Sequence, residues 1–344
     1  MSNERPRDRE VRNVETDGAG FDTDLTEASH LFVRSHYPAP QLAEGAWTIA
    51  VAGEVDRPRR WNLSDLDALP QRSIVATLEC AGNSRKRFGE IAPGEIAWGD
   101  GAVGCAEWSG TPLTELLRAA GPRPGTQYVA FLGADQPEDS GAPRFERGLS
   151  LMPGGPAAET LVASRLNGEP LPTDHGGPVR LVVPGWYGMA WVKWIASIHV
   201  QIRPFEGWFQ SSRYVYRSAE GKGVPPVPVE RLRVKSIVVR PRAGEHVRCG
   251  EPCLIRGKAW SADGPIRSVE VDTGSGWTAG RLRPGVGRFA WSDWELRWVP
   301  DRSGVRRIRC RAVDAVGESQ PEVPDPNPFQ YGCNSVQALE VEVV

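Results

Sequence analysis

The alternation of apolar and polar residues predicts short strands along much of the chain. WTIAVAGEV (47–55) is periodic at strand spacing, and RSIVATLE (72–79) is again a strand-like run that ends at a loop of small and polar residues. NLSDLDALP (62–70) is typical of a short helix with Ser64 as its N-cap. TPLTELLRAAG (111–121) has leucines at helical spacing, a threonine at its start and a glycine at its end, so we expect a helix there.

Strand-like apolar runs separated by glycine and proline continue to about residue 202. YVAFLGAD (128–135) and the segment 178–202 are the clearest of them. This pattern predicts a mixed α+β domain in which strands dominate. The next segment, GKGVPPVPVE (221–230), has no apolar period and is rich in glycine and proline, which is the composition of a linker.

Beyond the linker, strand candidates recur about every ten to fifteen residues with turns between them. This rhythm is typical of an immunoglobulin-like β-sandwich. We therefore divide the chain into a loosely packed N-terminal arm (1–30), a mixed, β-dominated domain (31–222) and an immunoglobulin-like domain (229–344). The strand candidates of the last domain are RVKSIVV, PCLIRGKAW, IRSVEVD, DWELRWV, RRIRCRAVD and VQALEVEV.

Composition narrows the function classes. With 344 residues, 40% of them hydrophobic, the chain can bury two domain cores. Its net charge of −2 gives no electrostatic reason to expect nucleic acid or an acidic membrane as a partner. No apolar run reaches the ~18 residues of a membrane helix. The first residues lack the apolar core of a signal peptide, so we expect a cytoplasmic protein, or a periplasmic one only if an export signal was removed.

The segment TLECAGNSR places Cys80 where a strand gives way to a loop of small residues. A cysteine there is sterically open, and Arg85 nearby would favour its thiolate form. From these residues alone Cys80 could be a nucleophile, a ligand of a soft metal or a small buried apolar residue. The six cysteines are too few and too scattered for a disulfide framework, and we interpret the pair Cys249 and Cys253 as structural.

CAGNSR resembles the C-A-G-N-(R/S)-R signature of the sulfite oxidase family. In that family the cysteine is the protein's ligand to a molybdenum held by molybdopterin. Further blocks match in the family's order, and the tail with CRAVD and QP (310–321) resembles its dimerisation domain. The matching blocks are FVRSHYPAP (32–40), CAGNSR (80–85), WGDGAVGCAEWSGTPLTELL (98–117), LNGEPLPTDHGGPVRLVVPG (166–185) and VKW (192–194).

The resemblance implies a sulfite oxidase-like, molybdopterin-binding domain over 31–222, with Cys80 as the metal ligand. Molybdenum takes soft sulfur donors, and the terminal phosphate of the pterin needs cations and hydrogen-bond donors. A carboxylate such as that of Asp135 could accept hydrogen bonds from ring nitrogens. The positions that match the family's cofactor contacts are Phe32, Val33, Arg34, Ser35, His36, Asp135, His175, Arg180, Trp191, Val192 and Lys193.

For the substrate, the resemblance implies a pocket for a small oxyanion. Arg34 and Arg85 match its arginines, Tyr214 its tyrosine, and Trp98 would form an apolar wall. Guanidinium groups suit a dianion because they form charge-assisted hydrogen bonds. The sequence departs from the family at Tyr331, where animal sulfite oxidases bring a further arginine from the C-terminal domain.

The implied activity is oxygen-atom transfer, by which sulfite is oxidised to sulfate. The chain has no C-x-x-C-H haem motif and no H-P-G-G segment, so we expect the electrons to leave to a separate acceptor such as a cytochrome. The family likeness also implies a homodimer. Two alternatives stay open: a reductase of nitrate or sulfoxides on the same cofactor, and a dimeric binding protein that keeps the scaffold without the cofactor.

Overall fold

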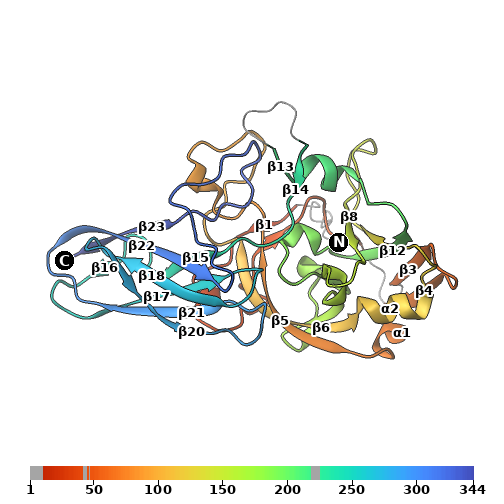
Figure 1. Ribbon diagram of the computed structural model, residues 1–344, viewed down its shortest axis with the longest axis horizontal. Helices are drawn as coiled ribbons and strands as arrows, with labels where there is room; N and C mark the ends of the chain where they lie inside the picture. The colour runs from red at the N-terminus through yellow and green to blue at the C-terminus, as the bar shows by residue number, and fades with distance from the viewer. Residues whose placement is uncertain (1–10, 42–44, 46, 218–224) are drawn as a thin grey trace, which may run out of the picture.

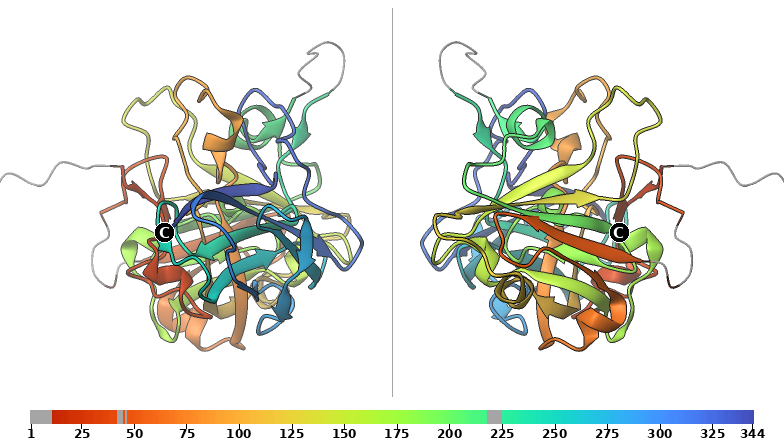
Figure 2. Two further views of the ribbon diagram at one scale, coloured as in Figure 1. Left: turned by 90° about the vertical axis from the view of Figure 1, so that its left-hand side faces the viewer. Right: turned by 90° about the vertical axis from the view of Figure 1, so that its right-hand side faces the viewer.

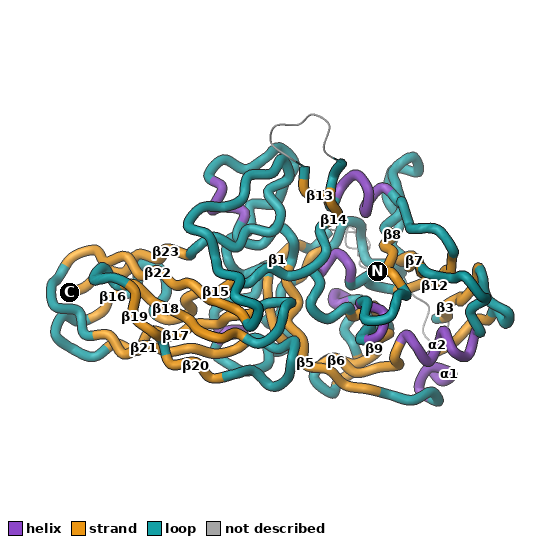
Figure 3. The backbone as a smooth tube through the Cα atoms, viewed as in Figure 1, coloured by secondary structure: helices purple, strands orange, loops and turns teal. Residues whose placement is uncertain are grey.

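The computed structural model describes residues 11–41, 45, 47–217 and 225–344. The N-terminal half and the C-terminal half form separate bodies that lie side by side, with the C-terminal strands at the left of Figure 1. Strands joined by loops and short helical turns dominate both halves, as Figure 3 shows, so the predicted fold class is confirmed. Residues 1–10 of the predicted arm and 221–224 of the predicted linker lie outside the described residues.

Antiparallel pairing prevails in the first domain. One sheet runs in the order β4-β3-β12-β7-β8, in which β12 is parallel to β3 and antiparallel to β7. Another runs β10-β9-β6-β5, with β11 also paired to β9. The strands are β3 (Thr48–Gly53), β4 (Arg59–Asn62), β5 (Arg72–Glu79), β6 (Val103–Pro112), β7 (Tyr128–Gly133), β8 (Glu146–Ser150), β9 (Leu161–Leu166), β10 (Glu169–Pro170), β11 (Arg180–Val182) and β12 (Ile195–Gln201).

Both predicted helices exist, but their starts differ from the prediction. Helix α1 (Leu63–Asp67) is capped by Asn62, whose side-chain oxygen accepts a hydrogen bond from the Asp65 N–H at 2.8 Å. Ser64 as the N-cap was therefore wrong, because Asn62 and Asp65 together make a capping box. Helix α2 (Leu113–Ala120) begins after Pro112, since the preceding residues still pair with β9.

Helix α2 ends at Gly121, which adopts a left-handed φ of 69°. Its N–H bonds the Leu117 carbonyl at 2.9 Å, as predicted for a C-cap, and short helical turns complete the domain. The 3₁₀ turns are η1 (Ala19–Phe21), η2 (Arg85–Phe88), η3 (Pro156–Ala158), η4 (Thr173–His175) and η5 (Gly188–Ala190), and η6 (Phe209–Arg213) is a π-turn.

The N-terminal arm is packed from residue 11 onward, so the prediction of a loosely packed arm was wrong for its described part. Strand β1 (Asn13–Val14) pairs with β2 (Val33–Arg34), and the Thr16 hydroxyl bonds the Val103 carbonyl at 2.7 Å. Farther on, the Lys258 ammonium bonds the Thr23 carbonyl at 2.8 Å. Long-range hydrogen bonds to both domains, rather than an apolar stripe, hold the arm, and Figure 2 shows it against the C-terminal strands.

The C-terminal half is the predicted β-sandwich. One sheet runs β15-β17-β21-β20 and the other β16-β23-β22-β18-β19, around a core of valines, isoleucines and Trp294. All the strand candidates of this half form strands. The bounds are β15 (Lys235–Arg240), β16 (His246–Val247), β17 (Cys253–Trp260), β18 (Ile266–Asp272), β19 (Trp277–Ala279), β20 (Arg281–Arg283), β21 (Ser292–Trp298), β22 (Gly304–Asp314) and β23 (Gln337–Val343). Between the halves, β13 (Val215–Tyr216) and β14 (Val227–Pro228) form a separate two-stranded antiparallel sheet.

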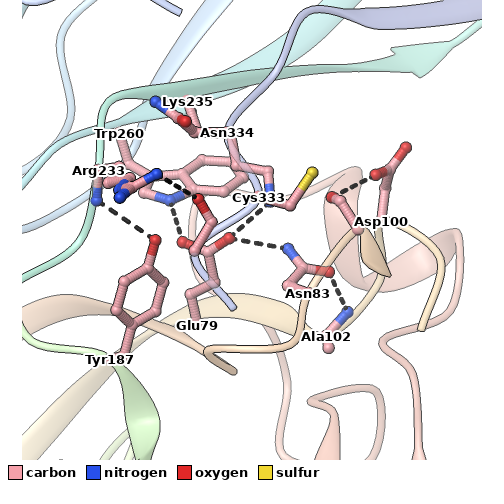
Figure 4. A network of polar contacts seen from close by, with 12 residues as sticks. Glu79, Asn83, Asp100, Ala102, Tyr187, Arg233, Lys235, Trp260, Cys333 and Asn334 are labelled. Carbon is pink, nitrogen blue, oxygen red and sulfur yellow. Dashed lines mark hydrogen bonds and ion pairs between the residues drawn. The ribbon is translucent and has the colours of Figure 1, made fainter. Parts of the chain in front are cut away.

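A buried polar network joins the halves directly beneath the end of β5 (Figure 4). The Glu79 carboxylate pairs with the Lys235 ammonium at 2.8 Å, and both side chains are 1% exposed. Glu79 also accepts hydrogen bonds from Trp260 Nε1 at 2.8 Å and from the Asn83 amide at 3.0 Å. The residue that precedes Cys80 is therefore held from the C-terminal domain.

Candidate active site

A cavity of about 660 Å³, including the solvent at its mouth, opens in the first domain. Residues far apart in the sequence meet there, from the segment 32–36 that includes β2, from the end of β5 and from the segment that joins β11 to β12. Most of the residues predicted for the cofactor and substrate line it. They are Phe32, Arg34, Ser35, His36, Cys80, Asp135, His175, Arg180, Trp191, Lys193 and Tyr214.

Cys80 lies at the point where β5 leaves its sheet. Its N–H bonds the Ala102 carbonyl at 2.9 Å, and its carbonyl accepts the Asn83 N–H at 2.9 Å, so the chain turns sharply after the cysteine. A Cβ at Gly82 would lie 2.6 Å from the Arg85 guanidinium, so a larger residue there would displace Arg85 from its contacts with Glu95 and the Ile96 carbonyl. The loop thus brings the Cys80 sulfur to the cavity while its backbone bonds stay satisfied.

Burial raises the pKa of the Cys80 thiol, and the nearby charge of Arg34 opposes this more than Arg85 does. Arg85 acts in the predicted direction, since its charge lowers the Cys80 pKa, but burial outweighs it in the protein without a metal. Desolvation disfavours the charged form more than the arginines favour it. A metal ion at this position would supply the missing positive charge, because a coordinated thiol is deprotonated.

Two cations, the buried Arg180 and the half-buried Lys193, lie at another part of the cavity. Arg180 is 4% exposed and donates to the carbonyls of His175 and Trp191 at 2.9 and 3.0 Å, while its Nε has no partner among the described residues. The Lys193 ammonium bonds the Ser35 hydroxyl at 2.5 Å and the Asp174 carbonyl at 3.0 Å. No carboxylate in the described part of the chain pairs with Arg180 or Lys193 within 4.0 Å.

Burial lowers the pKa values of Arg180, Lys193 and His175, and an anion bound beside them would favour the protonated forms. The pKa of Arg180 is lowered to about 9 by burial, and that of Lys193 to about 7 by burial and by Arg180. Burial also lowers the pKa of His175 to about 4, so its ring is neutral at pH 7 while Nε2 lies 2.8 Å from the Ala28 carbonyl. Buried cations without a counter-ion are costly, and a phosphate would offset that cost.

Binding of a dianion here should weaken as the pH rises from 6.5 to 8, because Lys193 loses its proton near pH 7. Sulfate is a suitable probe since its own charge is constant over this range. Above about pH 7 each pH unit should weaken binding by up to about tenfold, because binding must then take up a proton. The measurement is calorimetric titration of protein made without molybdopterin, in two buffers that differ in ionisation enthalpy.

Lys193→Gln is the control for this titration, since it removes the group that titrates and should flatten the pH dependence. Lys86→Gln, at an exposed position, should leave the pH dependence of the parent protein unchanged. Sulfate affinity that is equal at both ends of the range in the parent protein would contradict the assignment.

The remaining cavity groups are mostly neutral. Burial lowers the pKa of His36 well below its usual value, and its Nε2 shares a hydrogen bond of 2.8 Å with the Tyr214 hydroxyl. Burial raises the pKa of Asp135 to about 6. Hydrogen-bond donors from a bound ligand would stabilise its charged form. Arg34 lines the cavity and is steadied by the Asn13 side-chain oxygen at 3.3 Å, so the arm positions a predicted substrate contact.

Some predicted residues do not line the cavity. Arg85 is 2% exposed and pairs with Glu95 at 2.9 Å, and it bonds the Ile96 carbonyl at 2.8 Å. Trp98 is buried in the apolar core. Val33 and Val192 are also buried away from the cavity wall. The roles predicted for these residues stay predictions. Because Arg85 does not line the cavity, it would attract an anion there by its charge rather than by a direct hydrogen bond.

Other residues line the cavity without having been predicted. Those next to predicted positions, such as Asp174 and Trp194, could have been found from their neighbours in the matching blocks. Phe145 and Met189 gave no signal, because a lone apolar residue looks the same in a core as in a cavity wall. The unpredicted residues are Leu78, Ala81, Phe145, Asp174, Gly188, Met189 and Trp194.

Two family models match the chain in succession. The oxidoreductase molybdopterin-binding domain matches residues 36–209, and the Mo-co oxidoreductase dimerisation domain matches 227–327. Chicken sulfite oxidase is 33% identical over 321 residues, which cover 87% of this chain and 68% of that protein. The chain belongs to the sulfite oxidase family of molybdopterin-binding oxidoreductases. The family resemblance inferred from the motifs is thereby confirmed.

Other relatives widen the range of activities within the family. A soybean inducible nitrate reductase is 29% identical over 342 residues, covering 87% of this chain and 37% of that protein. The solved structure of the sulfane dehydrogenase SoxCD from Paracoccus pantotrophus has a TM-score of 0.78 at 27% identity and covers 92% of this chain and 81% of that one. The chain spans 58% of human mitochondrial sulfite oxidase.

The cavity fits a molybdopterin. It presents a cysteine sulfur at one part and an orphaned guanidinium nitrogen with an unpaired ammonium at another, which suits a ligand that carries a metal and a phosphate. The six cysteines, all in the described ranges, are free, so Cys80 is available as a ligand. No helix in the described part of the chain is long and apolar enough to span a membrane.

Proposed function

We propose that this protein oxidises sulfite to sulfate at a molybdenum cofactor ligated by Cys80. The observation that carries the proposal is that Cys80, the buried Arg180 and the half-buried Lys193 line the same cavity, and that neither cation has a carboxylate partner among the described residues. A small anionic group and a soft metal are the ligands that such a cavity stabilises. The family to which the chain belongs, and the likeness to chicken sulfite oxidase, support sulfite as the substrate.

The chain's own residues have separable roles in this proposal. Cys80 holds the metal, and Arg180 and Lys193 hold the phosphate. His175, which lines the same part of the cavity, forms hydrogen bonds beside them. Arg34 and the Tyr214 hydroxyl orient the oxyanion, with charge-assisted bonds of roughly 1.5–3 kcal/mol each. The bound cofactor would supply the two-electron redox chemistry, and the protein supplies binding, orientation and electrostatics.

Electrons would leave to a separate acceptor such as a cytochrome, and we propose a homodimer through the C-terminal domain, supported by its match to the dimerisation model. The test is protein purified from a host that makes molybdopterin. We expect about one molybdenum per chain by elemental analysis, and sulfite-dependent reduction of cytochrome c or ferricyanide. A preparation that contains molybdenum but does not oxidise sulfite would contradict the assignment of sulfite as the substrate.

Reduction of nitrate is the second candidate, because plant nitrate reductases are also similar to the chain and Tyr331 makes the substrate region less positive than an arginine would. The same preparation, given nitrate or a sulfoxide and a reduced viologen dye, distinguishes this reductase from the oxidase. A preparation with no molybdenum from a competent host would instead favour a binding protein on this scaffold.

A further inference from the structure

The region beside Tyr214 holds a tyrosine hydroxyl that nothing in the described part of the chain satisfies. Tyr331, in the segment between β22 and β23, is 2% exposed, and its ring stacks on that of Tyr214 with centroids 5.0 Å apart. Its backbone is fixed by the Asn327 side chain, which accepts the Tyr331 N–H at 2.9 Å. The buried Tyr331 hydroxyl has no hydrogen-bond partner among the described residues, so it adds no negative charge or acceptor demand to the arginines around it.

Arg213 lies on the same ring. Its guanidinium carbon is 5.6 Å from the Tyr331 ring centroid and 5.0 Å from that of Phe329. It ends η6 and immediately precedes Tyr214, so the backbone that presents the cavity tyrosine also presents this cation. The Arg213 side chain is 19% exposed and therefore still reaches solvent. Aromatic faces orient a guanidinium without neutralising it.

The charges around these tyrosines do not balance. The Glu95 carboxylate is shared by two cations, Arg213 at 2.6 Å and Arg85 at 2.9 Å. Arg34 has no carboxylate within 4.0 Å among the described residues, and buried Arg147 bonds only the carbonyls of Phe209 and Val229. Burial lowers the pKa of Arg147 to about 10, so it remains charged at pH 7. Positive charge is thus in excess beside the cavity.

We propose that Arg213 is a specificity-determining residue, which binds a small dianionic oxyanion beside Tyr214 and Tyr331 and sets its affinity. This inference rests on the proposed function and names the residue that recognises the substrate. The excess charge attracts the dianion toward Tyr214, while the rings of Tyr331 and Phe329 orient the Arg213 guanidinium just outside the residues that line the cavity. A merely structural Arg213 would instead serve only to hold Glu95.

The test replaces Arg213 by glutamine in the full, cofactor-loaded enzyme. KM for sulfite should rise about 10- to 100-fold, the worth of one charge-assisted hydrogen bond, with kcat within about threefold of the parent. Calorimetry should show the same weakening for sulfate, a readout that needs no turnover. Arg213→Lys should recover much of the affinity, because it restores the charge but not the forked geometry.

Arg217→Gln is the matched control, since Arg217 is exposed and only four residues away, and we expect KM and sulfate affinity to stay within about twofold. If Arg213→Gln behaves like this control in an enzyme that oxidises sulfite, the inference is overturned and the proposed function stands. If the parent does not oxidise sulfite but Arg213→Gln still weakens sulfate binding about tenfold, the proposed function fails and the oxyanion contact stands. A fall in molybdenum content and thermal midpoint with KM unchanged would show a structural role and overturn the inference.

Discussion

Replacing Cys80 by serine should abolish sulfite oxidation without unfolding the protein. Serine has nearly the same shape as cysteine and the site is almost buried, so the fold should survive. A hydroxyl is a hard, weakly acidic donor that cannot replace a thiolate toward molybdenum. Groups that merely support a metal ligand are typically worth about 10–100-fold, so loss of the ligand itself should cost at least about a hundredfold in kcat.

The measurement pairs turnover with the near-ultraviolet spectrum, the molybdenum content and the thermal midpoint. Cys105→Ser is the matched control, because Cys105 is a buried cysteine of the same sheet that does not line the cavity. That variant should keep its molybdenum spectrum and most of its activity. Undiminished sulfite oxidation by Cys80→Ser would remove the sulfur from the mechanism, and an unfolded Cys80→Ser beside a folded Cys105→Ser would assign Cys80 a structural role.

Much of the fold could be predicted because its signals are local. RSIVATLE is a strand-like run that ends where the small and polar residues of CAGNSR begin, and the structure has β5 at Arg72–Glu79 as predicted. In the C-terminal domain every strand candidate is bounded by turn residues, whereas β16, β19 and β20 were missed because two or three residues carry too little pattern. The arm could not be predicted, since its hydrogen bonds go to residues far along the chain.

The candidate site divides in the same way. Cys80 and the cluster of His175, Arg180 and Lys193 lie in blocks with a recognisable order, so the sequence was enough to predict that they meet. The position of Arg85 was not predictable, because it depends on Glu95, which gave no sequence signal. Arg213 was overlooked for a related reason: its importance comes from a ring 118 positions away, at Tyr331.

The second large effect concerns stability and comes from the pair of Glu79 and Lys235. These side chains are 156 positions apart, are both 1% exposed and join the two domains (Figure 4). Glu79 is the residue directly before Cys80. Lys235→Met would keep the length of the side chain but leave the Glu79 carboxylate buried and unpaired. Breaking a buried ion pair in this way typically costs about 3–5 kcal/mol.

We therefore expect Lys235→Met to lower the free energy of unfolding by about that much, measured by urea denaturation. The double variant Glu79→Gln/Lys235→Met should regain part of the loss, because glutamine removes the unpaired charge. It should not regain all of it, because Trp260 and Asn83 donate to different oxygens of Glu79 and glutamine keeps only one acceptor oxygen. Arg281→Met breaks the exposed pair with Glu295 and should cost less than about 1 kcal/mol. If Lys235→Met were no more costly than Arg281→Met, the pair would contribute nothing to joining the domains, and the Cys80 loop would owe its position to the first domain alone.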